Sequence, residues 1–165
     1  MKSHVREEPV IRRSLSIELW RQSGLQGEMI PVRITLAGDS MRPLIRRDRD
    51  RVTILPVGKK LRVGDVVLFK GGPGRYVVHR VCRLRDGMVQ TLGDNCMTPD
   101  PWMPLERVWG QVVRLERFGR SWRLDTGLAR AWGSIWMAAF PLRLLYKRSR
   151  RMAGRCFRCV FPKAG

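Results

Sequence analysis

Histidine, cysteine and long uncharged apolar runs are all scarce in this chain, and each shortage narrows what the protein can be. His4 and His79 are the only histidines among 165 residues, so imidazole chemistry in the folded part depends on His79. Four cysteines are too few for the disulfide framework of a small secreted domain and indicate a reduced, cytoplasmic protein. No run of about 18 uncharged apolar residues is present, which argues against a membrane-spanning helix. Charges recur too often in residues 1–30 for a secretory signal peptide.

Acidic residues are also few, and the end of the chain has none. The sequence holds 33 Lys and Arg against 14 Asp and Glu, a formal net charge of +19. Residues 126–165 contain nine basic residues and no acidic one. A surface of this kind attracts nucleic acid, anionic lipid and acidic peptides alike. Charge by itself therefore does not identify the partner.

The middle of the chain, residues 29–124, predicts a mainly β domain. Its short runs either alternate with period two or are continuously apolar, and clusters of Gly, Pro and Asp separate them at close intervals. Such a succession predicts a coiled β-sheet or a barrel. The predicted strands are residues 32–36, 51–55, 65–69, 76–83, 88–92, 108–116 and 121–124.

The two ends of the chain differ from this middle. In the N-terminal extension, residues 1–28, we expect residues 1–13 to lack regular structure and Ser14 to cap a short helix that reaches Gln22. Residues 125–165 form a basic amphipathic segment with a predicted helix. The apolar residues near one face of that helix are Leu128, Trp132, Ile135, Trp136, Ala139 and Phe140.

A basic block, residues 147–151, follows this predicted helix directly. An apolar helix with tryptophans, followed by Lys and Arg, is typical of a helix that lies on an anionic membrane. Arg130 and Pro141 disfavour deep insertion, so the expected contact is peripheral and involves residues 128–151. The alternative is a helix that packs on its own β domain and carries a solvated basic tail.

Two polar residues in the predicted β domain are candidates for catalysis. Ser40 lies in a turn between a glycine and a proline, and His79 lies in a predicted strand. A serine hydroxyl becomes a useful nucleophile when a base accepts its proton and a third group orients that base. The downstream carboxylates Asp94 and Asp100 are candidates for the orienting group. Each of these residues by itself is more often structural, Asp94 as a turn residue above all.

Four motifs occur in order between residues 36 and 113. The first three are residues 38–43 around Ser40, the Gly-Asp-Val-Val of residues 64–67, and residues 78–81 around His79. The fourth is Gly-Asp-Asn at residues 93–95, followed by Asp100 and by Gly-Gln-Val-Val at residues 110–113. Together they resemble the catalytic domain of the type I signal peptidase family, whose superfamily includes the self-cleaving repressors of the SOS response. The chain departs from the family at Arg49-Asp50, where the family usually has Gly-Asp, and in lacking the usual N-terminal membrane anchor.

His79 stands where the common bacterial branch of that family has a lysine, so the chain is similar to the Ser/His branch found in archaea and the endoplasmic reticulum. The resemblance implies a signal-peptidase-like coiled sheet and a serine endopeptidase. Ser40 would be its nucleophile and His79 its general base, with Asp100 preferred over Asp94 as the orienting carboxylate. It further implies cleavage of an extended peptide, such as a precursor or leader, after small residues.

Two alternatives to this interpretation belong to other functional classes of protein. A catalytically inactive basic protein with the same fold could dock nucleic acid or an anionic membrane. A self-cleaving repressor is disfavoured, because it would have a lysine base and a DNA-reading helix-turn-helix, so no specific nucleic acid partner is expected. The basic block at residues 147–151 favours the cytoplasmic face of a membrane. We therefore expect a cytoplasmic protein, at most peripherally attached.

The cysteines predict neither a metal site nor a cofactor. Cys156 and Cys159 have Cys-x-x-Cys spacing, but a zinc site needs about four ligands, and a thioredoxin-like site needs a βαβ unit that the pattern lacks. We interpret both as incidental thiols. Cys82 and Cys96 flank the candidate motifs, and a disulfide between them is left open.

Overall fold

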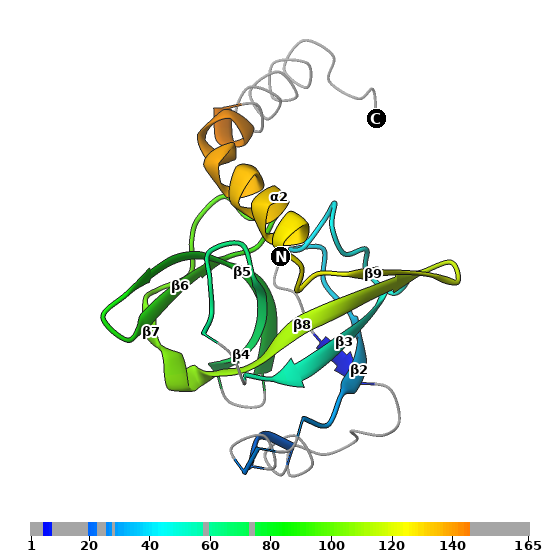
Figure 1. Cartoon of the computed structure of the whole chain (residues 1–165). Helices are drawn as coiled ribbons and strands as arrows, with labels where there is room; N and C mark the ends of the chain where they lie inside the picture. Colours follow the sequence, from blue (N-terminus) through cyan, green and yellow to red (C-terminus); the bar gives the residue numbers. More distant parts are fainter. Residues whose placement is uncertain are drawn as a thin grey trace, which may run out of the picture.

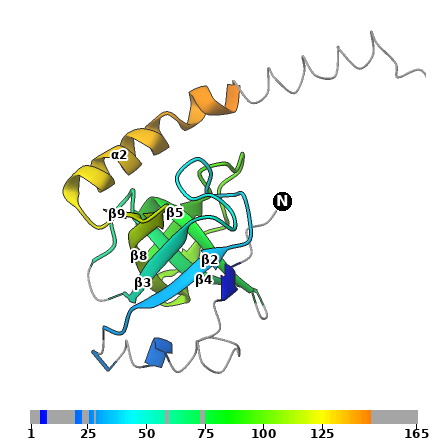
Figure 2. The same cartoon turned by 90° about the vertical axis from the view of Figure 1, so that its right-hand side faces the viewer.

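The computed structural model describes residues 5–7, 20–22, 26–27, 29–57, 60–72 and 75–145. In these ranges the chain is mainly β, as the sequence predicts, and its strands join one antiparallel sheet that curls into an open barrel (Figures 1 and 2). The strand order is β1-β2-β3-β8-β4-β5-β6-β7, and β9 pairs with β8. The strands are β1 (Val5–Glu7), β2 (Val32–Leu36), β3 (Arg51–Pro56), β4 (Val66–Gly72), β5 (Arg75–Arg85), β6 (Met88–Leu92), β7 (Met103–Pro104), β8 (Val108–Arg117) and β9 (Arg120–Arg123).

Two strands were not predicted from the sequence. Residues 5–7, expected to lack regular structure, form β1 and pair with β2. The two-residue strand β7 pairs with β6 through Val89 and Met103 and leads into a 3₁₀ turn, Leu105–Arg107. A strand of two or three residues is too short to display a period of two, so the pattern along the chain carries no signal for it.

The core is divided between two clusters of buried side chains, and β4 contributes to both. Val66 and Leu68 enter one cluster, while Val67 and Phe69 enter the other. Successive side chains of a strand point to opposite faces. The continuous apolar run of β4 is therefore explained by burial on both faces of the sheet. Each fully buried side chain of this size contributes about 1.5–3 kcal/mol.

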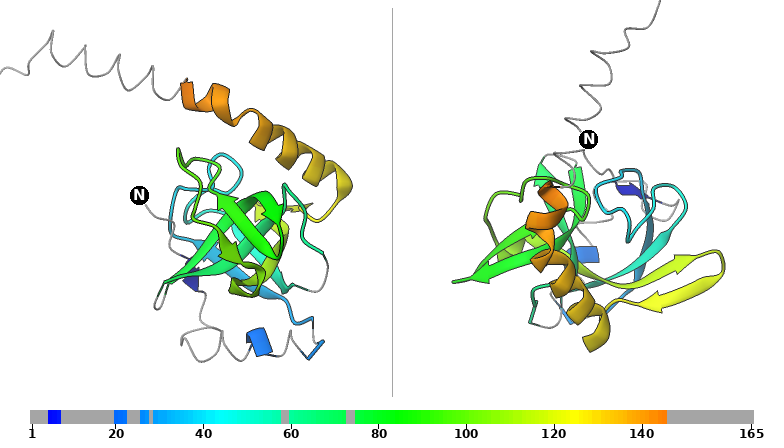
Figure 3. Two further views of the ribbon diagram at one scale, coloured as in Figure 1. Left: turned by 90° about the vertical axis from the view of Figure 1, so that its left-hand side faces the viewer. Right: turned by 90° about the horizontal axis from the view of Figure 1, so that it is seen from above.

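The helix α2 (Gly127–Ala138) runs across one end of the barrel (Figures 2 and 3), and residues 140–145 continue in helical conformation. Thr126 caps it, since its hydroxyl accepts a hydrogen bond from the Ala129 N–H at 3.2 Å. Among the residues that the structure describes, no helix combines the length and the apolar character that crossing a bilayer requires.

Some expectations for the two ends fall beyond the described ranges. Of the helix predicted for residues 14–22, the structure describes Trp20–Gln22, which is helical. Trp20 is buried and donates its indole N–H to the carbonyl of Ile30 at 2.8 Å, so this part of the extension packs on the barrel. The basic block at residues 147–151 and the pair Cys156 and Cys159 lie outside the described residues.

Candidate active site

Ser40 lies in the turn that follows β2, and buried neighbours hold that turn in place. The side chains of Met41 and Ile45 are fully buried in the core beneath it, and the Ile45 N–H donates to the Met41 carbonyl at 2.9 Å. The Asn95 N–H donates to the Ser40 carbonyl at 2.7 Å. The serine backbone is therefore fixed from two directions, by the core and by the segment after β6.

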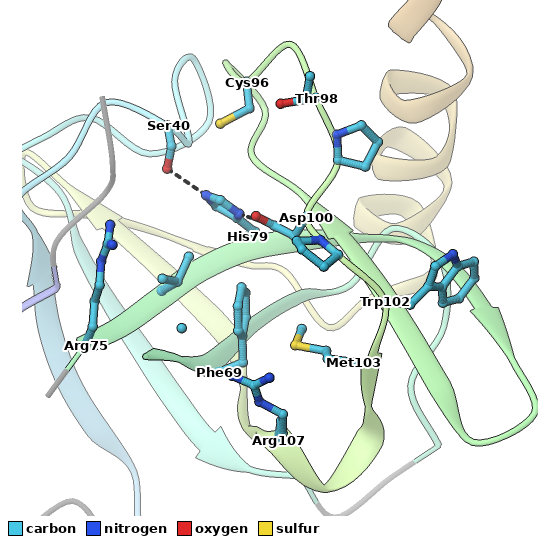
Figure 4. Close-up of a pocket in the computed structure, with 14 residues that line it drawn as sticks. Ser40, Phe69, Arg75, His79, Cys96, Thr98, Asp100, Trp102, Met103 and Arg107 are labelled. Carbon is cyan, nitrogen blue, oxygen red and sulfur yellow. Dashed lines mark hydrogen bonds and ion pairs between the residues drawn. The ribbon is translucent and has the colours of Figure 1, made fainter. Parts of the chain in front are cut away.

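His79 is presented to Ser40 by strand β5. Its neighbour Val78 is fully buried in the core, so the alternation of the strand turns His79 to the opposite face, where it packs edge-on against Phe69. The imidazole Nε2 lies 3.0 Å from the Ser40 Oγ (Figure 4). Two residues that are 39 positions apart in the chain are thus in hydrogen-bonding contact.

Asp100 completes a chain of three side chains. Its Oδ2 lies 2.6 Å from the His79 Nδ1 and also accepts the Thr91 hydroxyl at 2.7 Å. The backbone is fixed as well, because the Asp100 N–H donates to the Thr91 carbonyl at 2.8 Å. A carboxylate in this position holds the proton on Nδ1 and leaves Nε2 free to accept the proton of the serine hydroxyl.

Asp94, the second candidate for the orienting role, is engaged elsewhere. Arg80 binds both of its carboxylate oxygens, with Nε to Oδ1 at 2.8 Å and Nη2 to Oδ2 at 2.7 Å. The side chains are 4% and 1% exposed, which makes this a buried ion pair. The structure therefore brings Ser40, His79 and Asp100 together, and it gives Asp94 to Arg80.

The surroundings of His79 change its proton affinity. Burial lowers the pKa of the imidazole, but the hydrogen bond to the Asp100 carboxylate and a second one involving the Cys96 thiol raise it by more. The net result is a pKa of about 9, against 6.5 for an ordinary histidine. At neutral pH the resting imidazole is therefore mostly protonated, and its neutral, basic form becomes dominant as the pH rises through 9.

Gly93 makes the close approach of these groups sterically feasible. A Cβ at this position would lie 2.6 Å from the Cys96 Sγ, 2.9 Å from the His79 Nε2 and 2.9 Å from the Ser40 carbonyl oxygen. Real Cβ contacts are never that short, and the Ser40 oxygen belongs to the fixed backbone of the turn. Any side chain at residue 93 would push the turn that carries Ser40 away from the imidazole.

A pocket of about 440 Å³ opens beside the three residues (Figure 4). Ser40 and His79 stand at one end of it, and Phe69, Val77 and Met103 supply apolar walls. The half of β5 that carries His79 borders this pocket and pairs with β4, while the β5–β6 ladder begins at Arg80. Ser40 and His79 therefore border a cavity with room for more than one side chain of a bound molecule.

Several residues of the site were not identified from the sequence. Thr91 donates its hydroxyl to Asp100, and the Cys96 thiol interacts with His79. Arg80 is buried, although arginines are mostly exposed. Their roles depend on which strands become neighbours, and no spacing along the chain reports that. The disulfide left open between Cys82 and Cys96 is absent, because both cysteines are free thiols.

Comparison with models of protein families finds no match, and no curated protein matches the chain. The interpretation of the site therefore depends on its own geometry and on the four ordered motifs.

Proposed function

We propose that this protein is a serine endopeptidase that resembles the type I signal peptidases and uses Ser40, His79 and Asp100 to cleave extended peptides. The observation that carries the proposal is the continuous contact from Ser40 Oγ to His79 Nε2, at 3.0 Å, and from His79 Nδ1 to Asp100 Oδ2, at 2.6 Å. Hydroxyl, imidazole and carboxylate in that order are the parts that acyl transfer to serine requires.

The proposed reaction has two stages. The Ser40 Oγ attacks the carbonyl carbon of the scissile amide while its proton passes to the Nε2 of neutral His79. The tetrahedral intermediate collapses when the imidazolium gives that proton to the departing amine, which leaves an ester on Ser40. Water, deprotonated by His79, then hydrolyses the ester and returns a proton to the serine oxygen.

The negative oxygen of the intermediate needs a hydrogen-bond donor that is already in place. Within the described part of the chain, the Ser40 N–H donates no hydrogen bond. Its turn is held by Met41 below and by Asn95 at the Ser40 carbonyl. A fixed and unused amide next to the nucleophile supports its assignment as the donor to that oxygen.

An extended peptide is the substrate that best suits this setting. The pocket runs along β5, and a chain laid beside a strand places every second side chain on the same face. The apolar walls near His79 suit an uncharged residue at the cleavage position, and the expected preference for small residues comes from the resemblance. A precursor or leader peptide meets these requirements, and a cytoplasmic location is proposed with it.

The test is to expose the purified protein to a diverse peptide library and to identify the cleavage products by mass spectrometry. We expect cleavage after small residues by the parent protein and by Ser121→Ala, which removes an exposed serine on β9. No cleavage is expected from Ser40→Ala. Absence of products from the parent protein, or equal products from Ser40→Ala, would leave an inactive basic binding protein as the better interpretation.

The cytoplasmic location has a separate test. In the cell of origin, vesicles of inverted orientation should leave the catalytic domain open to an added protease, and right-side-out vesicles should protect it. The opposite pattern would overturn the location without affecting the proposed activity.

A further inference from the structure

The first inference concerns an arginine that stands four residues from the catalytic histidine on the same strand. Arg75, Val77 and His79 alternate along β5, so they share one face, and all three line the pocket. Arg75 rises from the start of the strand toward the end of the pocket that holds Ser40 (Figure 4). Its side chain is therefore placed to meet a substrate that extends along the strand from the scissile bond.

Arg75 is half-buried, and one nitrogen of its guanidinium group has no hydrogen-bond partner among the described residues. Its Nε is buried and makes no hydrogen bond within the described residues. Among the residues that line the pocket, Asp100 is the one carboxylate, and its Oδ2 is already occupied by His79 and Thr91. A second arginine of the pocket, Arg107, differs because its Nη2 donates to the Lys70 carbonyl at 2.8 Å. The guanidinium of Arg75 lines the pocket and is only half-buried, so a carboxylate that enters the pocket would pair with it.

Building on the proposed function, we propose that Arg75 forms a subsite for an acidic side chain of the substrate peptide. Strand residues rise by about 3.3 Å each, so Arg75 stands about 13 Å from His79 along β5. An extended peptide beside the strand covers that distance in about four residues. Because the Arg75 side chain rises toward Ser40, the substrate class is a peptide with Asp or Glu within about four residues of the bond that is cleaved.

The experiment compares pairs of peptides that differ by one charge. Starting from a peptide that the protein cleaves, Glu or Gln is placed at each position from two to six residues on either side of the scissile bond. At one position we expect Glu to raise kcat/KM over Gln by about tenfold or more, the usual range for a hydrogen bond to a charged group. Arg75→Gln should abolish this preference, and Arg75→Glu should reverse it, so that the Gln peptide is cleaved faster than the Glu peptide.

A matched control is Arg83→Gln, which removes an exposed arginine of β5 outside the pocket and should keep the preference. Equal rates for Glu and Gln at every position would overturn the subsite while leaving the endopeptidase intact. A binding assay with Ser40→Ala separates the two proposals further. If this variant binds the Glu peptide more tightly than the Gln peptide, the subsite stands whether or not the parent protein is active. Equal binding of both peptides overturns it.

A second inference comes independently from helix α2, whose polar side faces the barrel. Arg130 donates to the Asp65 carboxylate at 2.9 Å, and Ser134 donates to the Val63 carbonyl at 3.3 Å. Gly133 packs so closely that a Cβ would lie 2.6 Å from the Arg80 Nη1 and 2.8 Å from the Gly64 carbonyl oxygen. A surface helix normally turns its apolar side to the domain and its polar side to water. The inner side of α2 is instead held by these polar contacts and by a glycine, next to the half-buried Trp136.

The outward side of α2 carries large apolar residues. The spacing of four, three, seven and three residues keeps them on one stripe, which continues through residues 140–145. Isolated exposed apolar residues are ordinary, but a contiguous stripe marks a contact surface. The residues of the stripe, with their exposed fractions, are Leu128 (87%), Trp132 (63%), Ile135 (61%), Leu142 (71%) and Leu145 (63%).

The charge around this stripe indicates what covers it. Residues 126–165 carry nine basic residues and no acidic one, and the basic block at residues 147–151 follows the stripe in the chain. The exposed Arg120 of β9 adds to the positive charge, whereas Arg123 is paired with Asp125. An apolar stripe with tryptophan and surrounding Lys and Arg suits the headgroup region of an anionic bilayer. We infer that the outward stripe of α2 docks the protein peripherally on an anionic membrane.

Sedimentation with vesicles tests this inference. The protein should bind vesicles of equal parts phosphatidylcholine and phosphatidylserine, and bind pure phosphatidylcholine much less. The variant Trp132→Glu with Ile135→Glu should bind at least about tenfold more weakly, because it lacks two apolar side chains that the membrane would cover in the bound protein. A control with Arg33→Glu, an exposed arginine on β2, should bind like the parent protein.

Absence of binding at low salt would overturn the inference, as would equal binding by the double variant. A dimer in solution that the double variant dissociates would also overturn it, because a second copy would then cover the stripe.

Discussion

His79 and Arg80 are neighbours on β5, and each pairs with an aspartate from the segment after β6. The two pairs differ in the surface they face, in their exposure and in the polar atoms they leave available. His79 and Asp100 face the pocket, with side chains that are 8% and 27% exposed. Arg80 and Asp94 face α2 and are 4% and 1% exposed. The first pair leaves one nitrogen for Ser40, whereas the second uses both carboxylate oxygens within itself.

The comparison shows that the alternation of β5 places the proposed catalytic side chain and a structural ion pair on opposite faces of the strand. Side chains next to each other on a strand face opposite sides, so His79 faces the pocket and the next residue, Arg80, enters a buried ion pair. Both residues of the ion pair also contact the helical segment. Gly133 of α2 packs closely against the Arg80 guanidinium, and Arg143, in the helical residues after α2, donates to the Asp94 carbonyl at 2.8 Å. Variants of the first pair should change activity, and variants of the second should change stability.

The largest expected effect is on activity and comes from the nucleophile. Ser40→Ala should reduce peptide cleavage by about 10⁴-fold or more, because the covalent route is lost. The free energy of unfolding, measured with urea, should stay within about 1 kcal/mol of the parent, since one hydroxyl is removed. Cleavage that persists in this variant at a similar rate would separate the activity from the proposed site.

Asp100→Asn should have the next largest effect. The amide no longer holds the proton on Nδ1 of His79, and the corresponding change in other serine hydrolases lowers kcat by about 10⁴-fold. The pKa of His79 should fall as well, since the Asp100 carboxylate is the largest contribution that raises it. Titration of the imidazole by NMR measures this shift. An unchanged titration would mean that Asp100 does not orient His79.

Asp94→Asn tests the second pair and should act on stability. Removing one partner of a buried ion pair leaves an uncompensated charge and costs about 3–5 kcal/mol. Replacing both partners, as in Arg80→Met with Asp94→Leu, should cost less, because no charge is left alone. Urea unfolding of the three proteins measures the difference. A kcat loss in folded Asp94→Asn as large as that of Asp100→Asn would contradict the division between the two pairs.

The pH dependence should be the mildest of these effects, and its direction follows from the raised pKa. His79 acts as a base in its neutral form, so kcat/KM should rise about tenfold per pH unit below the pKa and level off near pH 9. Because the fold favours the protonated imidazole, its contribution to stability is fully present below pH 6.5 and is lost as the pH rises through 9. A rate that is already constant from pH 6 to 9 would argue against His79 as the base.

Most of the strands could be predicted from the sequence because their residues alternate. The predicted limits of β2 and β6 are those of the structure, and the continuous apolar run of β4 indicated burial on both faces. The strands β1 and β7 were missed because they are too short to show a period. The exact ends of the longer strands depend on hydrogen bonds to neighbours, which the chain order does not fix.

The candidate site was predictable where chemistry restricts the choice. With two histidines in the chain, the base for Ser40 had few alternatives, and the resemblance favoured Asp100 over Asp94. The partners of the other charges were not predictable. Asp50 is fully buried and accepts a hydrogen bond from the Arg117 Nε at 2.8 Å, although the two residues are 67 positions apart in the chain. Only the paired strands β3 and β8 bring these residues together.

The most direct test of the central claim is labelling with a serine-reactive phosphonate, followed by mass spectrometry of the modified peptide. We expect one label, on Ser40, with a rate that rises with pH toward the His79 pKa of about 9. We also expect no label in His79→Ala. Labelling of another residue, or equal labelling of His79→Ala and the parent protein, would contradict the claim that Ser40, His79 and Asp100 work as one unit.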